Sequence, residues 1–318
     1  MAVIIMKFKW AGALFLLVFV LLIILIANNP FDYKKTGTAM DTMYNITAHG
    51  LNAERAVTKG IDKITEVENR MSATILDSDI YKLNNGGQTW GNHDTIRVIN
   101  RSRYFSWLSG GIFDATIKPI VDLYANDSNP KAADIALARA KVDYKKLVEN
   151  QPLSNGMQLD LGAIAKGYAV DEVALILRQE AMTNYIIDIG GNVSVYGKKY
   201  KVGIRDPFGD ADDTFATITA SNANIATSGK YERGEHIYDT KTGLPIDNNV
   251  ASATVMAGSA MDADAMSTIL YIMGENGLKL VEQQNAKGIL VLDDGTVVLT
   301  SNMKPEEIKI SNNKFKLR

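Results

Sequence analysis

Asp160-Leu-Gly-Ala-Ile-Ala-Lys166-Gly-Tyr-Ala-Val-Asp171 places a carboxylate, two glycines and a lysine around the expected start of a helix. Gly162 and Gly167 carry no side chain, so the backbone can approach a ligand closely there. A helix N-terminus adds unpaired N–H groups and the positive end of its dipole, which suit phosphate. The stretch therefore predicts a loop-to-helix junction that binds phosphate through Lys166. An ordinary turn with a solvated lysine is the alternative.

Helices and strands on either side of this junction are mixed without strict alternation. Before it we expect a strand over residues 43–48 and helices over 52–71, within 77–87, over 94–109, after the turn at 110–116, and over 131–141. After the junction helix, which should reach about residue 180, we expect strands over 185–189, 193–196, 200–204, 214–219, 224–227 and 251–257. Helices over 260–273 and to about 285, and strands over 288–292 and 296–299, complete the pattern. This order predicts an α+β fold in a single domain.

The composition excludes several classes of site. The chain has 318 residues, of which 46% are hydrophobic and 22% charged, so it can bury a large core. Its formal net charge of −2 gives no indication of nucleic-acid binding. It has no cysteine, which excludes disulfides, thiolate metal sites, cysteine nucleophiles and a lipid-modified cysteine.

The N-terminus predicts a membrane anchor. Lys7 and Lys9 precede an uncharged run from Trp10 to Ala27, which at ~1.5 Å per residue is just long enough to span a bilayer core. We expect a cytoplasmic N-terminus (1–9), a transmembrane signal anchor (10–27), a linker (28–40) and an extracytoplasmic domain (41–318). A cleaved signal peptide is the alternative, although its apolar run is usually shorter and Leu25 suits the cleavage pattern poorly.

Two further segments carry groups for metal binding and proton transfer. Asp264 and Thr268 are four residues apart on an expected helix, so they share one face and offer hard oxygen ligands for Mg²⁺. A solvated helix face is the alternative. The polar loop Thr227–Gly243 contains His236, one of three histidines, with Asp239 nearby, which suits proton transfer unless this histidine is structural.

Two glycine-containing turns complete the set. Ile187-Asp-Ile-Gly-Gly-Asn192 ends a strand at a double glycine that allows close backbone approach. Gly111-Ile112-Phe113-Asp114 sets an aromatic ring beside a carboxylate, which could hold the ring and a polar group of a nucleotide. A buried Phe113 followed by a helix-capping Asp114 is the alternative. The chain has no G-x-S-x-G elbow, Walker loop or H-E-x-x-H zinc pair.

Together these segments resemble the FAD:protein FMN transferase family, known as ApbE, over nearly all of residues 36–300. Five of them occur in the family's order and spacing: L-D-L-G-A-I-A-K-G-Y-A-V-D, I-D-I-G-G-N, S-G-K-Y-E-R, H-I-Y-D-T-K-T-G and D-A-D-A-M-S-T. The resemblance implies a single ApbE-like, T-fold-related α+β catalytic domain behind the N-terminal helix. It also implies FAD as substrate, Mg²⁺ as cofactor and an extracytoplasmic flavoprotein as partner.

The resemblance also assigns site residues. Those it places around FAD are Met40, Ile112, Phe113, Asp114, Asp160, Lys166, Ser228, Arg233 and Tyr238. Those it places on Mg²⁺ are Ala163, through its backbone carbonyl, and Asp264 and Thr268, through their side chains. His236 is the implied catalytic residue, and we expect Asp239 to orient it.

The chain departs from the family pattern at three places. The family's Met-Gly-Thr reads Met40-Asp41-Thr42 here, so a charged residue replaces glycine. A tyrosine that members often place shortly after Met-Ser is absent, and Ala73 and Thr74 occupy that region. The family's proline after H-I-x-D is Thr240, which should affect only the loop.

The expected reaction is transfer of FMN from FAD to a threonine or serine hydroxyl of the partner, with release of AMP. Hydrolysis of FAD to FMN and AMP is an alternative that uses the same ligands. A membrane-anchored protein that binds FAD without cleaving it is the second alternative. It differs from the transferase in that it would not need Asp264, Thr268 or His236 near the pyrophosphate.

Overall fold

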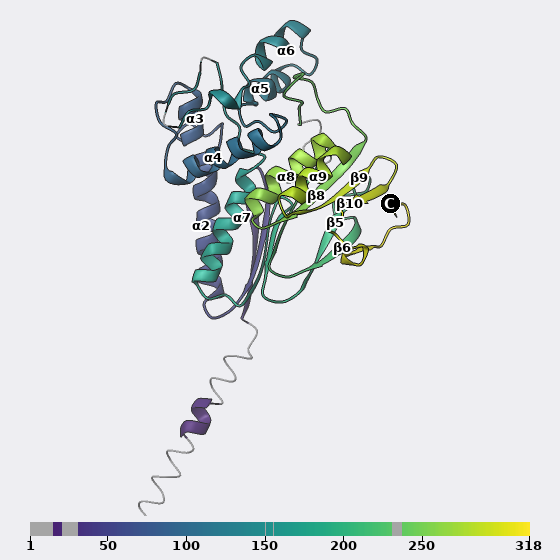
Figure 1. Ribbon diagram of the computed structural model, residues 1–318. Coiled ribbons are helices and arrows are strands. Elements are labelled where there is room, and N and C mark those ends of the chain that lie inside the picture. The colour runs from purple at the N-terminus through teal and green to yellow at the C-terminus, as the bar shows by residue number, and fades with distance from the viewer. Residues whose placement is uncertain (1–14, 21–30, 150, 155, 231–236) are drawn as a thin grey trace, which may run out of the picture.

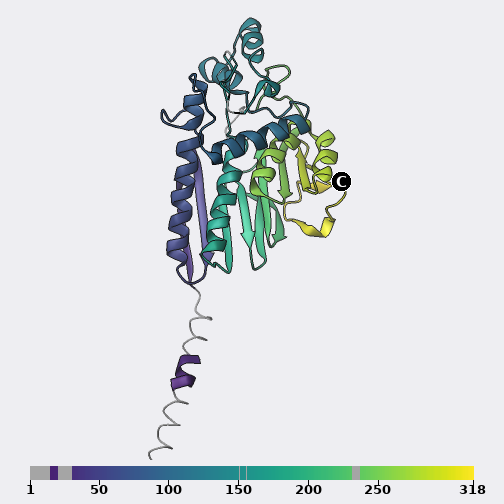
Figure 2. The same ribbon diagram turned by 60° about the vertical axis from the view of Figure 1, so that its left-hand side comes forward.

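The computed structural model describes residues 15–20, 31–149, 151–154, 156–230 and 237–318. A nine-stranded sheet of order β1-β2-β3-β4-β7-β8-β9-β10-β12 forms its centre, and helices cover one face (Figures 1 and 2). A three-stranded sheet of order β11-β6-β5 packs on the other face. Neighbouring strands run antiparallel except β10 and β12, which are parallel. The expected α+β fold in a single domain is confirmed.

The elements lie close to the predicted ranges. The strands are β1 (Asp32–Ala39), β2 (Thr42–His49), β3 (Asn184–Ile189), β4 (Asn192–Tyr196), β5 (Tyr200–Arg205), β6 (Thr214–Ala220), β7 (Ala223–Gly229), β8 (Val250–Ala257), β9 (Lys287–Leu292), β10 (Thr296–Leu299), β11 (Ile308–Ile310) and β12 (Lys316–Leu317). The helices are α2 (Ala53–Met71), α3 (Asp79–Asn84), α4 (His93–Leu108), α5 (Lys118–Asn126), α6 (Ala132–Arg139), α7 (Ala165–Gln179), α8 (Ala260–Met273) and α9 (Glu275–Gln283).

The linker predicted over residues 28–40 is wrong for most of its length. Asp32–Ala39 forms edge strand β1, which pairs with β2 along its whole length. A two-residue turn joins them, with φ of 54° at Met40 and 57° at Asp41. Positive φ at both positions is the geometry of a type I′ hairpin, in which glycine, asparagine and aspartate are favoured. Asp41 therefore suits the position where the family has glycine.

Two cores lie on the two faces of the large sheet. Strand β3 alternates: Ile187 and Ile189 are fully buried under the helices, and Ile186 faces the small sheet. The helix-side core includes Ile64 of α2 and Val173 of α7, and the core between the sheets includes Ile218 and Val291. Because strand side chains alternate between faces, Asp188 also faces the small sheet.

The C-terminal residues 309–318 contribute β12 and part of β11. Phe315 is buried, and its ring stacks on Phe215 with centroids 4.3 Å apart.

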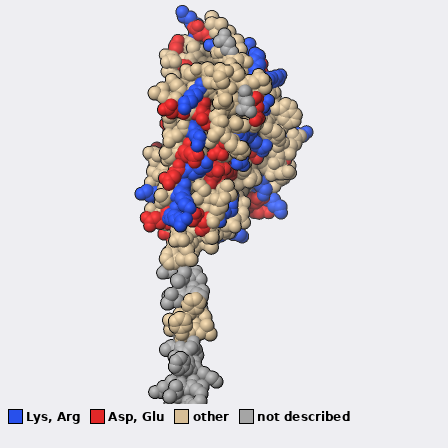
Figure 3. Space-filling view, turned by 90° about the vertical axis from the view of Figure 1, so that its left-hand side faces the viewer, with Lys and Arg blue, Asp and Glu red and all other residues tan. Residues whose placement is uncertain are grey.

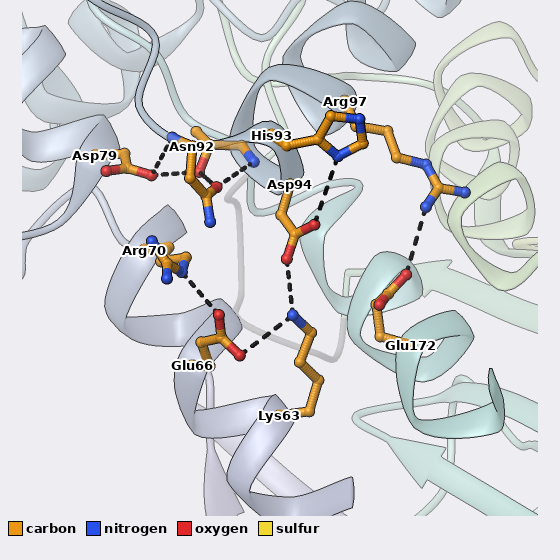
Figure 4. Close-up of polar contacts among 10 residues, drawn as sticks. Lys63, Glu66, Arg70, Asp79, Asn92, His93, Asp94, Arg97 and Glu172 are labelled. Carbon is orange, nitrogen blue, oxygen red and sulfur yellow. Dashed lines mark hydrogen bonds and ion pairs between the residues drawn. The ribbon is translucent and has the colours of Figure 1, made fainter. Parts of the chain in front are cut away.

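The helical layer is joined by ion pairs between its members (Figure 4). Lys63 of α2 lies 2.7 Å from Asp94 of α4, and Arg97 of α4 lies 3.4 Å from Glu172 of α7. The helix-covered side in Figure 3 accordingly shows acidic and basic side chains interspersed. The second of these contacts connects α4 to α7, which begins at the junction described above.

The predicted membrane anchor lies mostly outside the described residues. Of residues 10–27 the structure describes 15–20, which are helical. Among the described residues, no helix has both the length and the apolar character needed to cross a bilayer.

Candidate active site

A cavity of about 690 Å³ opens where the ends of several strands meet the start of α7 and one face of α8. This volume lies within the range of about 300–1,000 Å³ typical of ligand sites. The segments around it come from the β1–β2 turn, the loop before α5, the β3–β4 turn, β5, β7 and β8. The predicted site residues that line it are Ile112, Phe113, Asp114, Asp160, Ala163, Lys166, Ser228, Tyr238, Asp264 and Thr268.

The junction of α7 and α8 supplies the charged part of the cavity. Asp264 is only 3% exposed, and its Oδ1 lies 3.4 Å from Lys166 Nζ. The backbone N–H of Gly167 donates to Asp264 Oδ2 at 3.0 Å, and Lys166 Nζ donates to the carbonyl of Gly162 at 2.7 Å. The predicted loop-to-helix junction thus exists, and Lys166 is held beside the ligand space by specific partners.

This junction depends on the absence of a side chain at Gly167. A Cβ at Gly167 would lie 2.3 Å from the carbonyl oxygen of Ala260 and 2.7 Å from the Cα of Met261. Close approach of the two helices lets the Gly167 N–H reach Asp264. Glycine is therefore required here for helix packing. Gly167 is buried and, unlike Gly162, is not among the cavity-lining residues.

Hydroxyl groups extend the oxygen-rich wall beside Asp264. Thr268 Oγ1 donates to the Asp264 carbonyl at 3.4 Å and lies 3.3 Å from Ser228 Oγ, which in turn lies 2.8 Å from Ser267 Oγ. Ala163 lines the same space. A carboxylate, hydroxyls and a carbonyl are hard oxygen donors, so this set fits Mg²⁺ bound together with ligand phosphates. In the described part of the chain, no cluster of three His, Cys, Asp or Glu residues offers a metal site.

The Phe113–Asp114 turn matches the structural alternative only in part, because Phe113 is buried but the N-cap of α5 is Ile117 and not Asp114. Asp114 is 7% exposed and accepts hydrogen bonds from the backbone N–H and hydroxyl of Thr116 and from the backbone N–H of Tyr144. Burial raises the pKa of Asp114, although these hydrogen bonds oppose the shift. Phe113 is buried and packs edge-on against Phe105, with centroids 6.3 Å apart. The pair therefore forms the cavity wall, and its polar atoms are used within the fold.

Asp160 and Tyr238 are also positioned by neighbours. Asp160 Oδ1 accepts from the backbone N–H of Gly162 at 2.7 Å, which shapes the loop before α7. Tyr238 is 9% exposed and stacks on Tyr124 with ring centroids 4.8 Å apart. Asp160 and Tyr238 both line the cavity, and these contacts within the protein hold their side chains in place.

Several predicted residues fall elsewhere. His236 and Arg233 lie outside the described residues, so their roles stay predictions. Asp239 is not among the cavity-lining residues, and its Oδ1 accepts from the backbone N–H of Lys241 at 2.7 Å. Met40 packs against the helix-side core, while its neighbours Asp41, Thr42 and Met43 line the cavity.

The sequence interpretation assigned no role to three residues that the structure brings into or beside the site. Asp188 and Asp41 line the cavity, and Asp171 binds the start of α8. For Asp188 the available signal was its place between Ile187 and Ile189, which puts it on the face opposite two apolar side chains. For Asp171 there was no local signal, because its partners are 89 and 90 residues away.

Asp171 holds the N-terminus of the helix that carries Asp264. Its two carboxylate oxygens accept from the backbone N–H groups of Ala260, at 2.8 Å, and Met261, at 2.9 Å. These are orphan donors of the first helical turn, and a carboxylate there is also favoured by the helix dipole. Burial raises the pKa of Asp171 to about 6, despite the two hydrogen bonds.

Asp171→Ala is expected to lower the free energy of unfolding by about 1–2 kcal/mol, the usual cost of losing a helix cap. Since the folded-state pKa is raised, the stability linked to this group is fully present below about pH 4 and declines as pH rises through 6. The difference in free energy of unfolding between the wild type and Asp171→Ala, measured by chemical denaturation, should thus be larger at pH 5 than at pH 7.5. The neighbouring control Glu172→Ala, which loses one partly exposed ion pair with Arg97, should cost less than about 0.5 kcal/mol. Equal costs for the two variants would contradict the capping role.

Comparison with known proteins decides the family. The sequence model described as "ApbE family" matches residues 40–291, which is most of the chain. This chain belongs to the ApbE family. The resemblance drawn from the five segments is therefore confirmed, and the match includes both the α7 junction and α8.

Two curated relatives are matched over nearly their whole length. A protein of Vibrio cholerae named FAD:protein FMN transferase is 30% identical over 304 residues, covering 85% of this chain and 91% of that protein. One of Klebsiella pneumoniae with the same name is 28% identical over 310 residues, covering 89% and 95%.

Solved ApbE structures share the fold. The flavin transferase ApbE from Vibrio cholerae aligns with a TM-score of 0.75 at 26% identity, covering 87% of this chain and 99% of that one. The ApbE protein from Thermotoga maritima aligns with a TM-score of 0.76 at 27% identity, covering 84% and 96%. The expected ApbE-like fold is confirmed by these alignments.

Proposed function

We propose that this protein transfers FMN from FAD to a threonine or serine hydroxyl of an extracytoplasmic partner protein and releases AMP. The observation that carries the proposal is the Lys166–Asp264 pair, set beside the Thr268 and Ser228 hydroxyls inside a ligand-sized cavity. A cation, a buried carboxylate and hydroxyl oxygens suit a pyrophosphate. The relatives named FAD:protein FMN transferase support the same reaction.

In the proposed reaction one phosphoanhydride bond is exchanged for one phosphoester bond. The acceptor oxygen forms a bond with the FMN-side phosphorus, and the bond from that phosphorus to the bridging oxygen breaks. AMP leaves with the bridging oxygen. The hydroxyl proton passes to His236, which the family resemblance makes the base. Lys166 and the N-terminus of α7 bind and orient the phosphates, so positioning and electrostatics supply most of the rate.

Mg²⁺ belongs to the same proposal. Asp264, Thr268 and the carbonyl of Ala163 would hold the ion, and buried Asp264 is already oriented by Gly167. When bound, Mg²⁺ would polarise the phosphoryl oxygens and offset the charge of the leaving phosphate.

The cellular placement is proposed from the sequence. Lys7 and Lys9 before the uncharged run 10–27 support a single-pass anchor with a cytoplasmic N-terminus. The catalytic domain would then act outside the cytoplasm, where it would meet its acceptor flavoprotein.

The proposal is tested by incubating the protein with FAD, MgCl₂ and candidate extracytoplasmic flavoproteins, and recording intact masses and AMP. We expect the acceptor to gain the mass of one FMN less one water, with release of an equimolar amount of AMP. EDTA should prevent both. AMP and free FMN without acceptor labelling would indicate hydrolysis instead. Bound FAD that stays intact in Mg²⁺ would indicate a flavin-binding protein and overturn the transferase proposal.

A further inference from the structure

Asp188 is a cavity-lining carboxylate that takes no part in the mechanism above. It stands two residues before Gly190 in the turn between β3 and β4. Ile187 and Ile189 occupy the helix-side core, so Asp188 lies on the opposite face of the sheet from α7 and α8. It therefore belongs to a different compartment of the cavity from the Lys166–Asp264 pair.

The surroundings of Asp188 leave its charge poorly compensated. Among the described residues, one hydrogen bond reaches the Asp188 side chain: the backbone N–H of Gly191 donates to Oδ1 at 3.0 Å. No lysine or arginine in the described ranges forms an ion pair with it, and burial raises its pKa. Asp188 is half-buried, and removing a carboxylate from water is costly unless donors satisfy it. A donor supplied by a ligand in the cavity would complete the arrangement.

The wall next to Asp188 is apolar. Val193, Val202, Ile204 and Ile225 line the cavity, and each is at most 8% exposed. Val193 is the β4 partner of Asp188 in the antiparallel register, and Ile225 is the β7 partner of Val193. An apolar wall with a carboxylate acceptor at its edge suits a flat heterocycle that carries an N–H donor.

We propose that Asp188 accepts a hydrogen bond from an N–H group carried by one of the two heterocycles of FAD and selects the ring that enters this compartment. This inference rests on the proposed function of the cavity. FAD has two such donors: the exocyclic amino group of adenine, in the AMP half, and the imide N–H of the isoalloxazine ring, in the FMN half. An ionised carboxylate only accepts hydrogen bonds, so a ring that presents a carbonyl at this point is disfavoured.

Ligand pairs that differ at one donor test this on the wild-type protein. AMP is compared with purine riboside 5′-monophosphate, in which hydrogen replaces the amino group, and FMN with N3-methyl-FMN, which lacks the imide N–H. Dissociation constants are measured by competition with FAD. We expect one pair to differ by about tenfold or more, as for a hydrogen bond to a charged group, and that pair identifies the ring. Less than twofold discrimination in both pairs overturns the proposal.

Asp188→Asn provides the matched variant. Its amide oxygen can keep the Gly191 hydrogen bond while its NH₂ group faces the ligand, so an acceptor becomes a donor. We expect the discrimination found in the wild type to be lost or reversed. Asp212→Asn, at an exposed carboxylate on the same cavity, should keep it within about twofold. Equal loss in both variants would mean general charge repulsion and would overturn the role of Asp188.

The outcome also separates this inference from the proposed function. Ring discrimination without FMN transfer would overturn the transferase proposal and leave the role of Asp188 standing. FMN transfer without discrimination would overturn only the role of Asp188. Absence of FAD binding would overturn both.

Discussion

Asp264→Ala is expected to abolish Mg²⁺-dependent FMN transfer, with turnover falling by about three orders of magnitude or more. The variant removes the one carboxylate from the oxygen set that would hold the ion. It also leaves Lys166 Nζ without its buried partner and the Gly167 N–H without an acceptor. Helices α7 and α8 would lose the contact between the Gly167 N–H and the Asp264 carboxylate. Release of AMP against Mg²⁺ concentration measures the effect.

The matched control for this prediction is Asp262→Ala, two residues earlier on α8. The Asp262 carboxylate faces away from the cavity and accepts two hydrogen bonds from Arg101, at 2.8 and 2.6 Å. We expect its Mg²⁺ dependence to match the wild type. Normal Mg²⁺-dependent turnover in Asp264→Ala would remove Asp264 from the ligand set.

Gly167→Ala is expected to be among the most damaging substitutions of a single methyl group in this chain. The added Cβ would meet backbone atoms of Ala260 and Met261, which cannot rotate away as a flexible side chain can. Forcing α7 and α8 apart should lower the free energy of unfolding by about 3 kcal/mol, the upper range for overpacking. Urea denaturation measures this loss, and FAD titration measures the accompanying loss of affinity.

Gly258→Ala is the control for the effect of removing a glycine near α8. A Cβ at Gly258 meets no atom within 4 Å, and its φ is not positive, so stability should change by less than about 0.5 kcal/mol. If Gly167→Ala were as stable as Gly258→Ala and bound FAD normally, close helix packing would not be what Gly167 provides.

The sequence predicted most elements because their local signals agree with their final environment. Helix α8 begins and ends where predicted, Ala260–Met273, because its mostly apolar residues lie between Ser259 and Gly274, and Ser259 caps its start. Strand β1 was missed because an edge strand with exposed or half-exposed residues on both faces carries no apolar alternation. Its strand character comes from pairing with β2, which a linear pattern does not contain.

The candidate site was predicted only in part, because some of its residues take their roles from segments that are distant in the sequence. Lys166, Asp264 and Thr268 carry chemistry that spacing and residue type reveal, and the structure brings them together. The roles of Asp171 and Asp188 depend on which distant segments arrive beside them. Asp114 lines the cavity as expected, but its carboxylate also accepts hydrogen bonds from Thr116 and Tyr144, which residue type alone does not reveal.

The separation of Lys166 and Asp264 by 98 positions has a consequence for how the protein matures. Loop-closure entropy must be overcome before such a contact forms, so the phosphate end of the cavity appears only when the whole domain has folded. A nascent chain that has not yet delivered α8 offers no complete flavin site. Flavin should therefore stabilise the native state against global unfolding, and the amides it protects most from hydrogen exchange should be those that open only when the whole domain unfolds.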